Sequence, residues 1–215
     1  MTHVILFALT FLVLLDSQWV QAQDVENVLS RLERRYQSTR DLYASFTQIV
    51  RFGVTGNTQL FAGKLWMRKG NRYRIEMEQQ TIVTDGKTVW TFSELNKQVL
   101  IDKFRDDANA FTPDKVLVNV PKNYFANIIG NEKVDDGEIL ILKLVPREKK
   151  SLTKSMKVWV NTSEWLMAKV EVLDVSDNQT TYLIKDLKIN EGIADNLFHF
   201  DIPSDVEVVD LRASQ

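Results

Sequence analysis

A two-residue alternation, which begins at Leu42 and continues through most of the chain, constrains the fold more than any other feature. In its clearest stretch, Tyr73, Ile75 and Met77 alternate with charged residues. Successive side chains of a β-strand point to opposite faces, so this stretch predicts a strand with one apolar and one charged face. Turn residues separate it from similar stretches before and after it. The predicted strands span residues 43–53, 58–69, 72–78, 80–84, 87–93, 97–102, 138–146, 154–161, 165–174, 179–189 and 206–209.

A helical period appears in two places. Before the first strand, Val25, Leu29 and Leu32 recur at steps of three and four residues and predict an amphipathic helix that ends near residues 39–41. In the middle of the chain, an apolar stripe broken by a proline predicts two short helices, over residues 113–119 and 122–129. The connections between consecutive strands are short, which favours an antiparallel meander.

Several predicted strands are apolar on both faces. Leu65 and Met67 alternate with Trp66, for example, and the strand over residues 138–146 is equally apolar on either side. A sheet built from such strands must curl strongly or be covered. The predicted helices are the available cover, so we expect a mostly β protein with a helical lid.

The chain begins with a segment typical of secretion. Residues 5–15 form an apolar run, and Val20-Gln21-Ala22 provides the small residues that a signal peptidase recognises. The run is shorter than the roughly 20 residues of a transmembrane helix. We therefore expect a signal peptide over residues 1–22, a mature domain over residues 23–215, and secretion of that domain.

Composition excludes several kinds of chemistry. The chain has no cysteine, which excludes disulfides, thiol nucleophiles and zinc–thiolate sites. Its net charge of −2 gives no basic excess for nucleic-acid binding. His199 is the single histidine of the expected mature domain, and no nucleophile-elbow motif accompanies any serine. We expect neither catalysis nor a cofactor nor a metal.

A small basic segment surrounds Lys149-Lys150, with Arg147 and Lys154 beside it. Two interpretations stay open. The segment is either a solvated hairpin tip or a docking contact for an acidic partner or a membrane head group.

Four motifs occur in a characteristic order along the chain. Tyr43–Gln48 reads Y-A-S-F-T-Q, Gly63–Lys69 reads G-K-L-W-M-R-K, Asp85–Trp90 reads D-G-K-T-V-W, and the C-terminal part contains Leu197–Phe200, L-F-H-F. In this order and spacing the chain resembles the outer-membrane lipoprotein carrier family, LolA. The resemblance extends from about Asp24 to Arg212.

The resemblance implies a fold and a function. The implied fold is an unclosed antiparallel β-barrel covered by helices from the N-terminus and the middle of the chain. The implied function is that of a monomeric periplasmic chaperone, which takes lipoprotein cargo from an inner-membrane ABC transporter and passes it to an outer-membrane lipoprotein acceptor. Shielding acyl chains from water is worth about 0.8 kcal/mol per CH₂ group. The first alternative is a related module that binds a lipid or glycolipid, or senses lipids. The second is a hydrolase that acts on lipids, which would need His199 or a serine for turnover.

The resemblance also implies site residues. A lid latch in this family is an arginine, followed by proline, that binds lid carbonyl groups. Here Lys69-Gly70 takes that place, with Arg68 one residue earlier and therefore on the opposite face of the strand. Lysine lacks the planar donor fork of arginine, so the latch is expected to be weaker or made differently. The implied lipid-binding residues are Trp66, Tyr73, Ile75, Met77, Trp90, Phe92, Val116, Leu117 and Val120.

Overall fold

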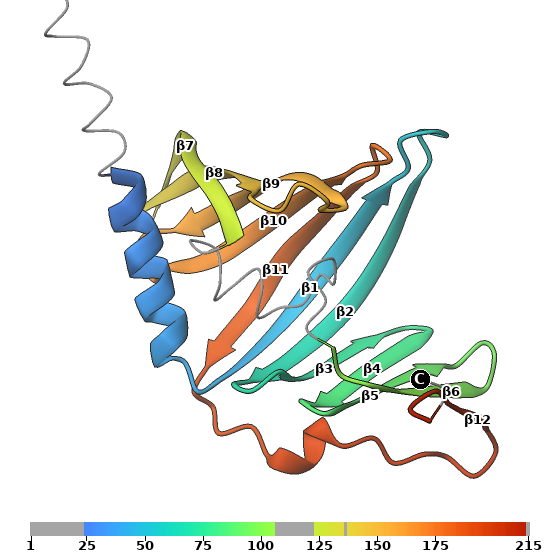
Figure 1. Cartoon of the computed structure of the whole chain (residues 1–215). Helices are drawn as coiled ribbons and strands as arrows, with labels where there is room; N and C mark the ends of the chain where they lie inside the picture. Colours follow the sequence, from blue (N-terminus) through green and yellow to red (C-terminus); the bar gives the residue numbers. More distant parts are fainter. Residues whose placement is uncertain (1–23, 106–122, 136, 214–215) are drawn as a thin grey trace, which may run out of the picture.

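The computed structural model describes residues 24–105, 123–135 and 137–213. They form a single curled β-sheet with an α-helix, residues 24–38, at one end (Figure 1). The strands are β1 (Asp41–Arg51), β2 (Thr58–Arg68), β3 (Arg72–Met77), β4 (Gln80–Asp85), β5 (Thr88–Ser93), β6 (Gln98–Lys103), β7 (Tyr124–Val134), β8 (Gly137–Pro146), β9 (Thr153–Asn161), β10 (Leu166–Asp174), β11 (Gln179–Ile189) and β12 (Glu207–Asp210).

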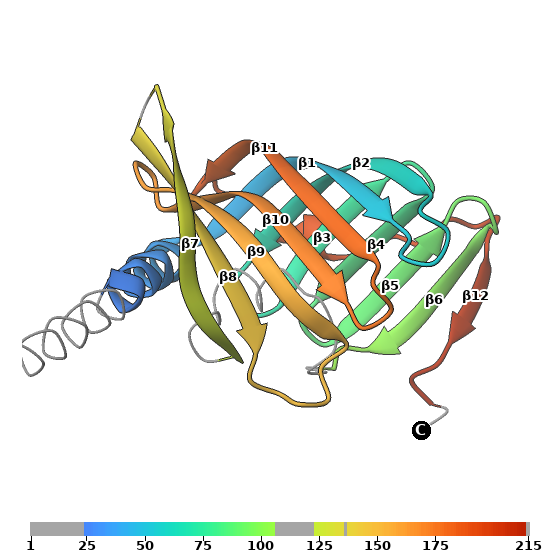
Figure 2. The ribbon, with the colours of Figure 1, turned by 90° about the horizontal axis from the view of Figure 1, so that it is seen from above.

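The sheet order is β12-β6-β5-β4-β3-β2-β1-β11-β10-β9-β8-β7. Two antiparallel meanders, β1–β6 and β7–β11, are joined where β1 pairs with β11. The short strand β12 adds to β6 in parallel. The edge strands β7 and β12 lie at opposite ends of the sheet, which curls without closing (Figure 2). The predicted strands and the unclosed antiparallel sheet are therefore confirmed.

The N-terminal helix packs on the concave face of the sheet. Its apolar stripe is buried against the inward side chains of β8, β9 and β10, as its period predicts. The Tyr36 hydroxyl, at the end of that stripe, accepts a hydrogen bond of 3.3 Å from the Met167 main-chain N–H. This main core contains Val25, Val28, Leu29, Leu32, Tyr36, Leu142, Leu144, Met156, Val158, Val160 and Met167 among its buried residues.

A second cluster of buried side chains lies on the opposite face, over β4, β5 and β6. We call it the outer cluster; its buried members are Val83, Trp90, Val99, Ile101 and Phe200. The segment that follows β11 covers it and includes a short 3₁₀ helix, η1 (Asp195–Phe198), which packs against β3 and β4. Figure 1 shows this segment running beneath the sheet, away from the N-terminal helix. The outer cluster therefore buries the apolar side chains on the outer face of β4, β5 and β6.

The predicted helix over residues 122–129 is wrong. From Tyr124 the chain forms β7, whose side chains alternate between partly buried and exposed along Phe125, Ala126 and Ile128. The apolar residues fit a helical period as well as an alternating one. The segment forms a strand because it pairs with β8. The other predicted mid-chain helix, residues 113–119, lies outside the described residues.

The predicted signal peptide also lies outside the described residues. In the part of the chain that the structure describes, no helix combines the length and apolarity needed to cross a membrane. Nor do the described ranges contain a group of three or more His, Cys, Asp or Glu residues that could hold a metal ion.

Candidate functional site

The concave face of the sheet contains a pocket of about 300 Å³ beside the C-terminal end of the helix. Its walls come from β1, β2, β3, β4, β10 and β11, and none of the described residues that line it is charged. Among these residues, polar side-chain atoms are limited to one amide and two hydroxyl groups. The lining residues are Tyr36, Leu42, Ala44, Phe46, Gln48, Leu65, Ile75, Met77, Ile82, Met167, Val170, Tyr182, Ile184 and Leu187.

The few polar groups of the pocket bind one another or the main chain. The Gln48 side-chain amide donates a hydrogen bond of 3.3 Å to the Tyr182 hydroxyl, and the Tyr36 hydroxyl accepts one from the main chain. Burial raises the pKa of Tyr182 to about 12 and also raises the pKa of Tyr36 well above its ordinary value. Both phenols are therefore neutral at physiological pH, and these walls carry no charge.

A glycine makes room for an aromatic ring in the wall of the pocket. Phe46 of β1 lies directly across from Gly63 of β2, with its ring over the glycine. A Cβ at Gly63 would overlap the Phe46 ring and lie 2.9 Å from the Glu76 main-chain oxygen. Phe46 also packs edge-on against Tyr182, at 6.1 Å between ring centroids. Gly63 thus sets the position of one wall of the pocket.

The alternation predicted for β3 is confirmed. Ile75 and Met77 line the pocket, and Tyr73 is buried in the main core beside them. On the opposite face, the Arg74 guanidinium pairs with the Glu76 carboxylate at 2.6 Å. Lipid contact at the three inward residues stays a prediction.

Three aromatic residues expected in the cavity lie on the other face of the sheet. Trp66 packs against Tyr43, at 5.4 Å between ring centroids, on the outer side of β1 and β2. Trp90 belongs to the outer cluster and packs against His199, at 5.3 Å between ring centroids. Phe92 is next to that cluster. The prediction that these three line the cavity is corrected: they stabilise the outer face instead.

The remaining predicted cavity residues, Val116, Leu117 and Val120, lie outside the described residues.

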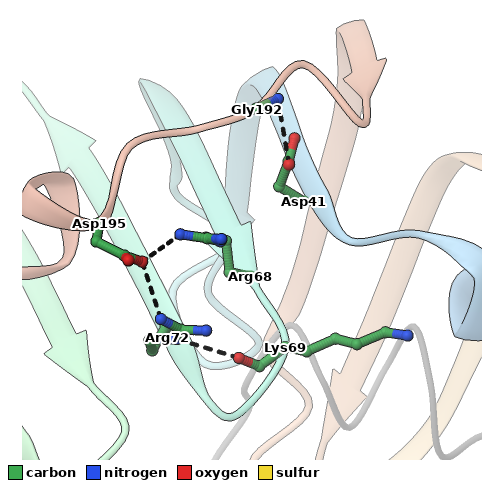
Figure 3. Close-up of polar contacts among 6 residues, drawn as sticks. All are labelled: Asp41, Arg68, Lys69, Arg72, Gly192 and Asp195. Atoms are coloured by element: carbon green, nitrogen blue, oxygen red, sulfur yellow. Dashed lines mark hydrogen bonds and ion pairs between the residues drawn. The ribbon is translucent and has the colours of Figure 1, made fainter.

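The two predicted latch residues face opposite sides. The Lys69 ammonium donates a hydrogen bond to the Gln37 main-chain oxygen, in the last turn of the helix. The Arg68 guanidinium instead pairs with the Asp195 carboxylate, which also binds Arg72 at 3.0 Å. Figure 3 shows the Lys69 side chain extending away from this ion-pair cluster. The helix contact is thus made by Lys69, and Arg68 anchors the segment that covers the outer cluster.

Sequence reasoning missed the walls contributed by β1, β10 and β11, and also Leu65 of β2 and Ile82 of β4. The signal was present in β1, where Leu42, Ala44, Phe46 and Gln48 alternate with residues of the other face. What the period could not indicate was the pairing of β1 with β11, which brings Ile184 beside Phe46 from far along the chain.

Comparison with known proteins agrees with this architecture. The family model "Outer membrane lipoprotein carrier protein LolA" matches residues 37–201. An outer-membrane lipoprotein carrier protein from Pasteurella multocida (strain Pm70) is 26% identical over 208 residues, which cover 95% of each chain. Another, from Glaesserella parasuis serovar 5 (strain SH0165), is 25% identical over 213 residues, which cover 98% of this chain and 96% of the relative.

Among solved structures, an uncharacterized conserved protein from Thermus thermophilus superposes with a TM-score of 0.56 at 15% identity, covering 86% of this chain and 98% of its own, and so shares the fold. The family match spans most of the chain and includes the strands that line the pocket. The chain therefore belongs to the LolA family of outer-membrane lipoprotein carrier proteins.

Proposed function

We propose that this protein carries lipoproteins between the inner and the outer membrane, with their acyl chains held in the concave pocket. The observation that carries the proposal is the pocket itself: its described walls are apolar and uncharged, and a helix borders it. Membership of the LolA family supports a lipoprotein-binding role. Acyl chains bring only apolar surface, so a wall without charge suits them and would not suit a polar ligand.

A carrier must shield the acyl chains of its cargo from water and must also release the cargo. Each CH₂ group removed from water contributes about 0.8 kcal/mol, so an acylated protein needs an apolar host to cross an aqueous space. Two flexible methionines, Met77 and Met167, line the pocket and can pack with or without a ligand. A cargo with several acyl chains needs more room than the pocket offers, and we propose that the N-terminal helix moves to provide it.

Lys69 is the proposed latch for that movement. Its hydrogen bond to Gln37 is solvent-exposed and connects the β2–β3 turn to the helix end. A single exposed hydrogen bond contributes about 1 kcal/mol, which is small enough for cargo binding to overcome.

The route and location belong to the same proposal. We propose that residues 1–22 are a signal peptide that is cleaved on secretion, and that the mature protein acts in the periplasm as a monomer. An inner-membrane ABC transporter would supply the cargo, and an outer-membrane lipoprotein acceptor would receive it. The mass of the protein purified from the periplasm tests the cleavage, since removal of residues 1–22 leaves a chain that begins at Gln23.

Complementation in the host tests the carrier role. A strain depleted of this protein should accumulate lipoproteins at the inner membrane, and the unaltered gene should prevent it. Phe46→Glu, which places a charge in the pocket, should fail to complement. Thr47→Glu, its neighbour on the outer face, is the matched control and should succeed. Absence of accumulation on depletion, or equal complementation by both variants, would contradict the proposal.

A related lipid- or glycolipid-binding or lipid-sensing module is the second candidate, because an uncharged pocket would accept acyl chains from any of these molecules. Mass spectrometry of species that copurify with the periplasmic protein separates the two functions. Acylated peptides support the carrier, and free lipids support the alternative.

A further inference from the structure

The edge of the sheet opposite β12 combines cations with exposed apolar side chains. Phe125 of β7 and Val145 of β8 are cross-strand neighbours, 54% and 37% exposed. Further along β8, Lys143 lies directly across from Lys157 of β9 on the same face. The β8–β9 turn adds more cations and projects beyond the sheet (Figure 2). We call this surface the basic patch; it consists of Phe125, Lys143, Val145, Arg147, Lys149, Lys150 and Lys157.

Stability alone does not explain this arrangement. Like charges directly across two strands destabilise a sheet, and the Lys143–Lys157 pair is of this kind. Lys157 pairs with the Glu171 carboxylate at 3.1 Å. The Arg147 guanidinium lies 4.1 Å from the centroid of the Phe125 ring and donates a hydrogen bond of 3.2 Å to the Tyr124 main-chain oxygen. The arginine thus fixes an aromatic ring in an exposed position.

The turn itself leaves its cations available. Lys149 and Lys150 are exposed, and neither forms an ion pair within the described parts of the chain. Leu152, 56% exposed, ends the turn beside Val175 of the β10–β11 turn, whose main-chain N–H donates to the Leu152 oxygen at 2.9 Å. Exposed aliphatic side chains therefore accompany the cations here as well.

We propose that the basic patch docks this protein on an anionic phospholipid bilayer. Aromatic and aliphatic side chains bury at the boundary between head groups and acyl chains, while neighbouring lysine and arginine side chains bind lipid phosphates. The patch contains five cations, with the carboxylates of Glu148 and Glu171 nearby, in a chain whose net charge is −2. In the adjoining β10–β11 turn, the Asp177 carboxylate is paired with Lys154 at 2.6 Å. The attraction is therefore local and orients this edge toward the membrane. Its projecting turn suits a broad surface better than it suits a small ligand.

Vesicle flotation of the mature protein tests the proposal. Phosphatidylcholine vesicles that contain phosphatidylglycerol should carry the protein at low salt, and high salt should release it. The double variant Lys149→Gln/Lys150→Gln should weaken binding by about 30-fold. Lys87→Gln/Lys103→Gln removes the same charge from two exposed positions, one just before β5 and one at the end of β6. It is the matched control and should bind like the unaltered protein.

Three outcomes would overturn the proposal. They are equal binding to vesicles without phosphatidylglycerol, equal effects of the two double variants, and binding to an acidic polypeptide but not to vesicles. Docking does not depend on the carrier role, and the two are separated by measuring binding of a fluorescent fatty acid to the same variants. The patch variants should bind that probe normally. A variant that loses only vesicle binding has a defect in the basic patch, and a variant that loses only probe binding has a defect in the pocket.

Discussion

The Lys69 ammonium donates a hydrogen bond to the Gln37 main-chain oxygen, which joins the β2–β3 turn to the C-terminal end of the N-terminal helix. The last carbonyl groups of a helix have no partner within the helix, and a cation near them is favoured by the helix dipole. The contact therefore holds the helix at the end nearest to the pocket, which Gln37's neighbour Tyr36 lines.

Replacing Lys69 should loosen this end of the helix. Lys69→Ala removes the charged donor and should cost about 1 kcal/mol. Hydrogen exchange of the amides in residues 28–38 should become faster, while exchange in the sheet stays the same. Lys69→Arg keeps a donor and should restore slow exchange. Unchanged exchange in Lys69→Ala would show that the helix is held by its apolar stripe alone.

Filling the space at Gly63 should displace Phe46. Gly63→Ala brings a Cβ against the Phe46 ring and the Glu76 main-chain oxygen, and overpacking of this kind costs about 1–3 kcal/mol. Urea unfolding should show the loss, and binding of a fluorescent fatty acid should weaken. Adding Phe46→Leu removes the overlapping ring atoms and should recover part of the stability. A Gly63→Ala protein as stable as the unaltered one would contradict the role given to this glycine.

Two strands show how far the sequence alone could predict which residues face the pocket. In β3 one face is charged, so the alternation alone placed Ile75 and Met77 on the concave side correctly. In β5 neither face is charged, since Trp90 and Phe92 alternate with Val89 and Thr91, and a two-residue period cannot say which face meets the pocket. Trp90 faces a cover that includes Phe200, which lies far away in the chain. Its position depended on a long-range contact that no local pattern contains.

The helix predicted for the middle of the chain was wrong for a different reason. Residues 122–129 satisfy a helical and an alternating pattern at once, and the choice between them came from pairing with β8. Short apolar segments are ambiguous in this way, because tertiary contacts outweigh their local preference.

Tyr182 should make the fold sensitive to alkaline pH. Burial raises its pKa from the ordinary value of 10.0 to about 12. Below pH 10 the phenol is neutral in both the folded and the unfolded chain, so stability is unaffected. Between about pH 10 and pH 12 the unfolded chain ionises first, and the free energy of unfolding should fall by on the order of 2 kcal/mol.

Urea unfolding of the unaltered protein and of Tyr182→Phe, below and above this range, measures the effect. The variant should lose less stability on going to alkaline pH, and the comparison cancels the titration of lysines. A parallel loss in both proteins would show that Tyr182 does not contribute.

The segment that covers the outer cluster should depend on packing more than on its ion pairs. Asp195 binds Arg68 and Arg72 but its side chain is 75% exposed, and such pairs contribute about 0–1 kcal/mol. Phe198 is only 2% exposed, and truncating a buried phenylalanine costs about 3–5 kcal/mol. Asp195→Ala should therefore lower the free energy of unfolding slightly and Phe198→Ala severely. The reverse order in thermal or urea unfolding would contradict this view.

Photocrosslinking tests the central claim most directly. A triacylated lipopeptide with a photoreactive group in an acyl chain is bound to the mature protein and irradiated, and the crosslinked residues are identified by mass spectrometry. Crosslinks should fall on the pocket walls, at Phe46, Ile75, Ile82 and Ile184. Crosslinks confined to the outer face, at Trp66, Trp90 or Phe92, would contradict the claim that the concave pocket holds the acyl chains.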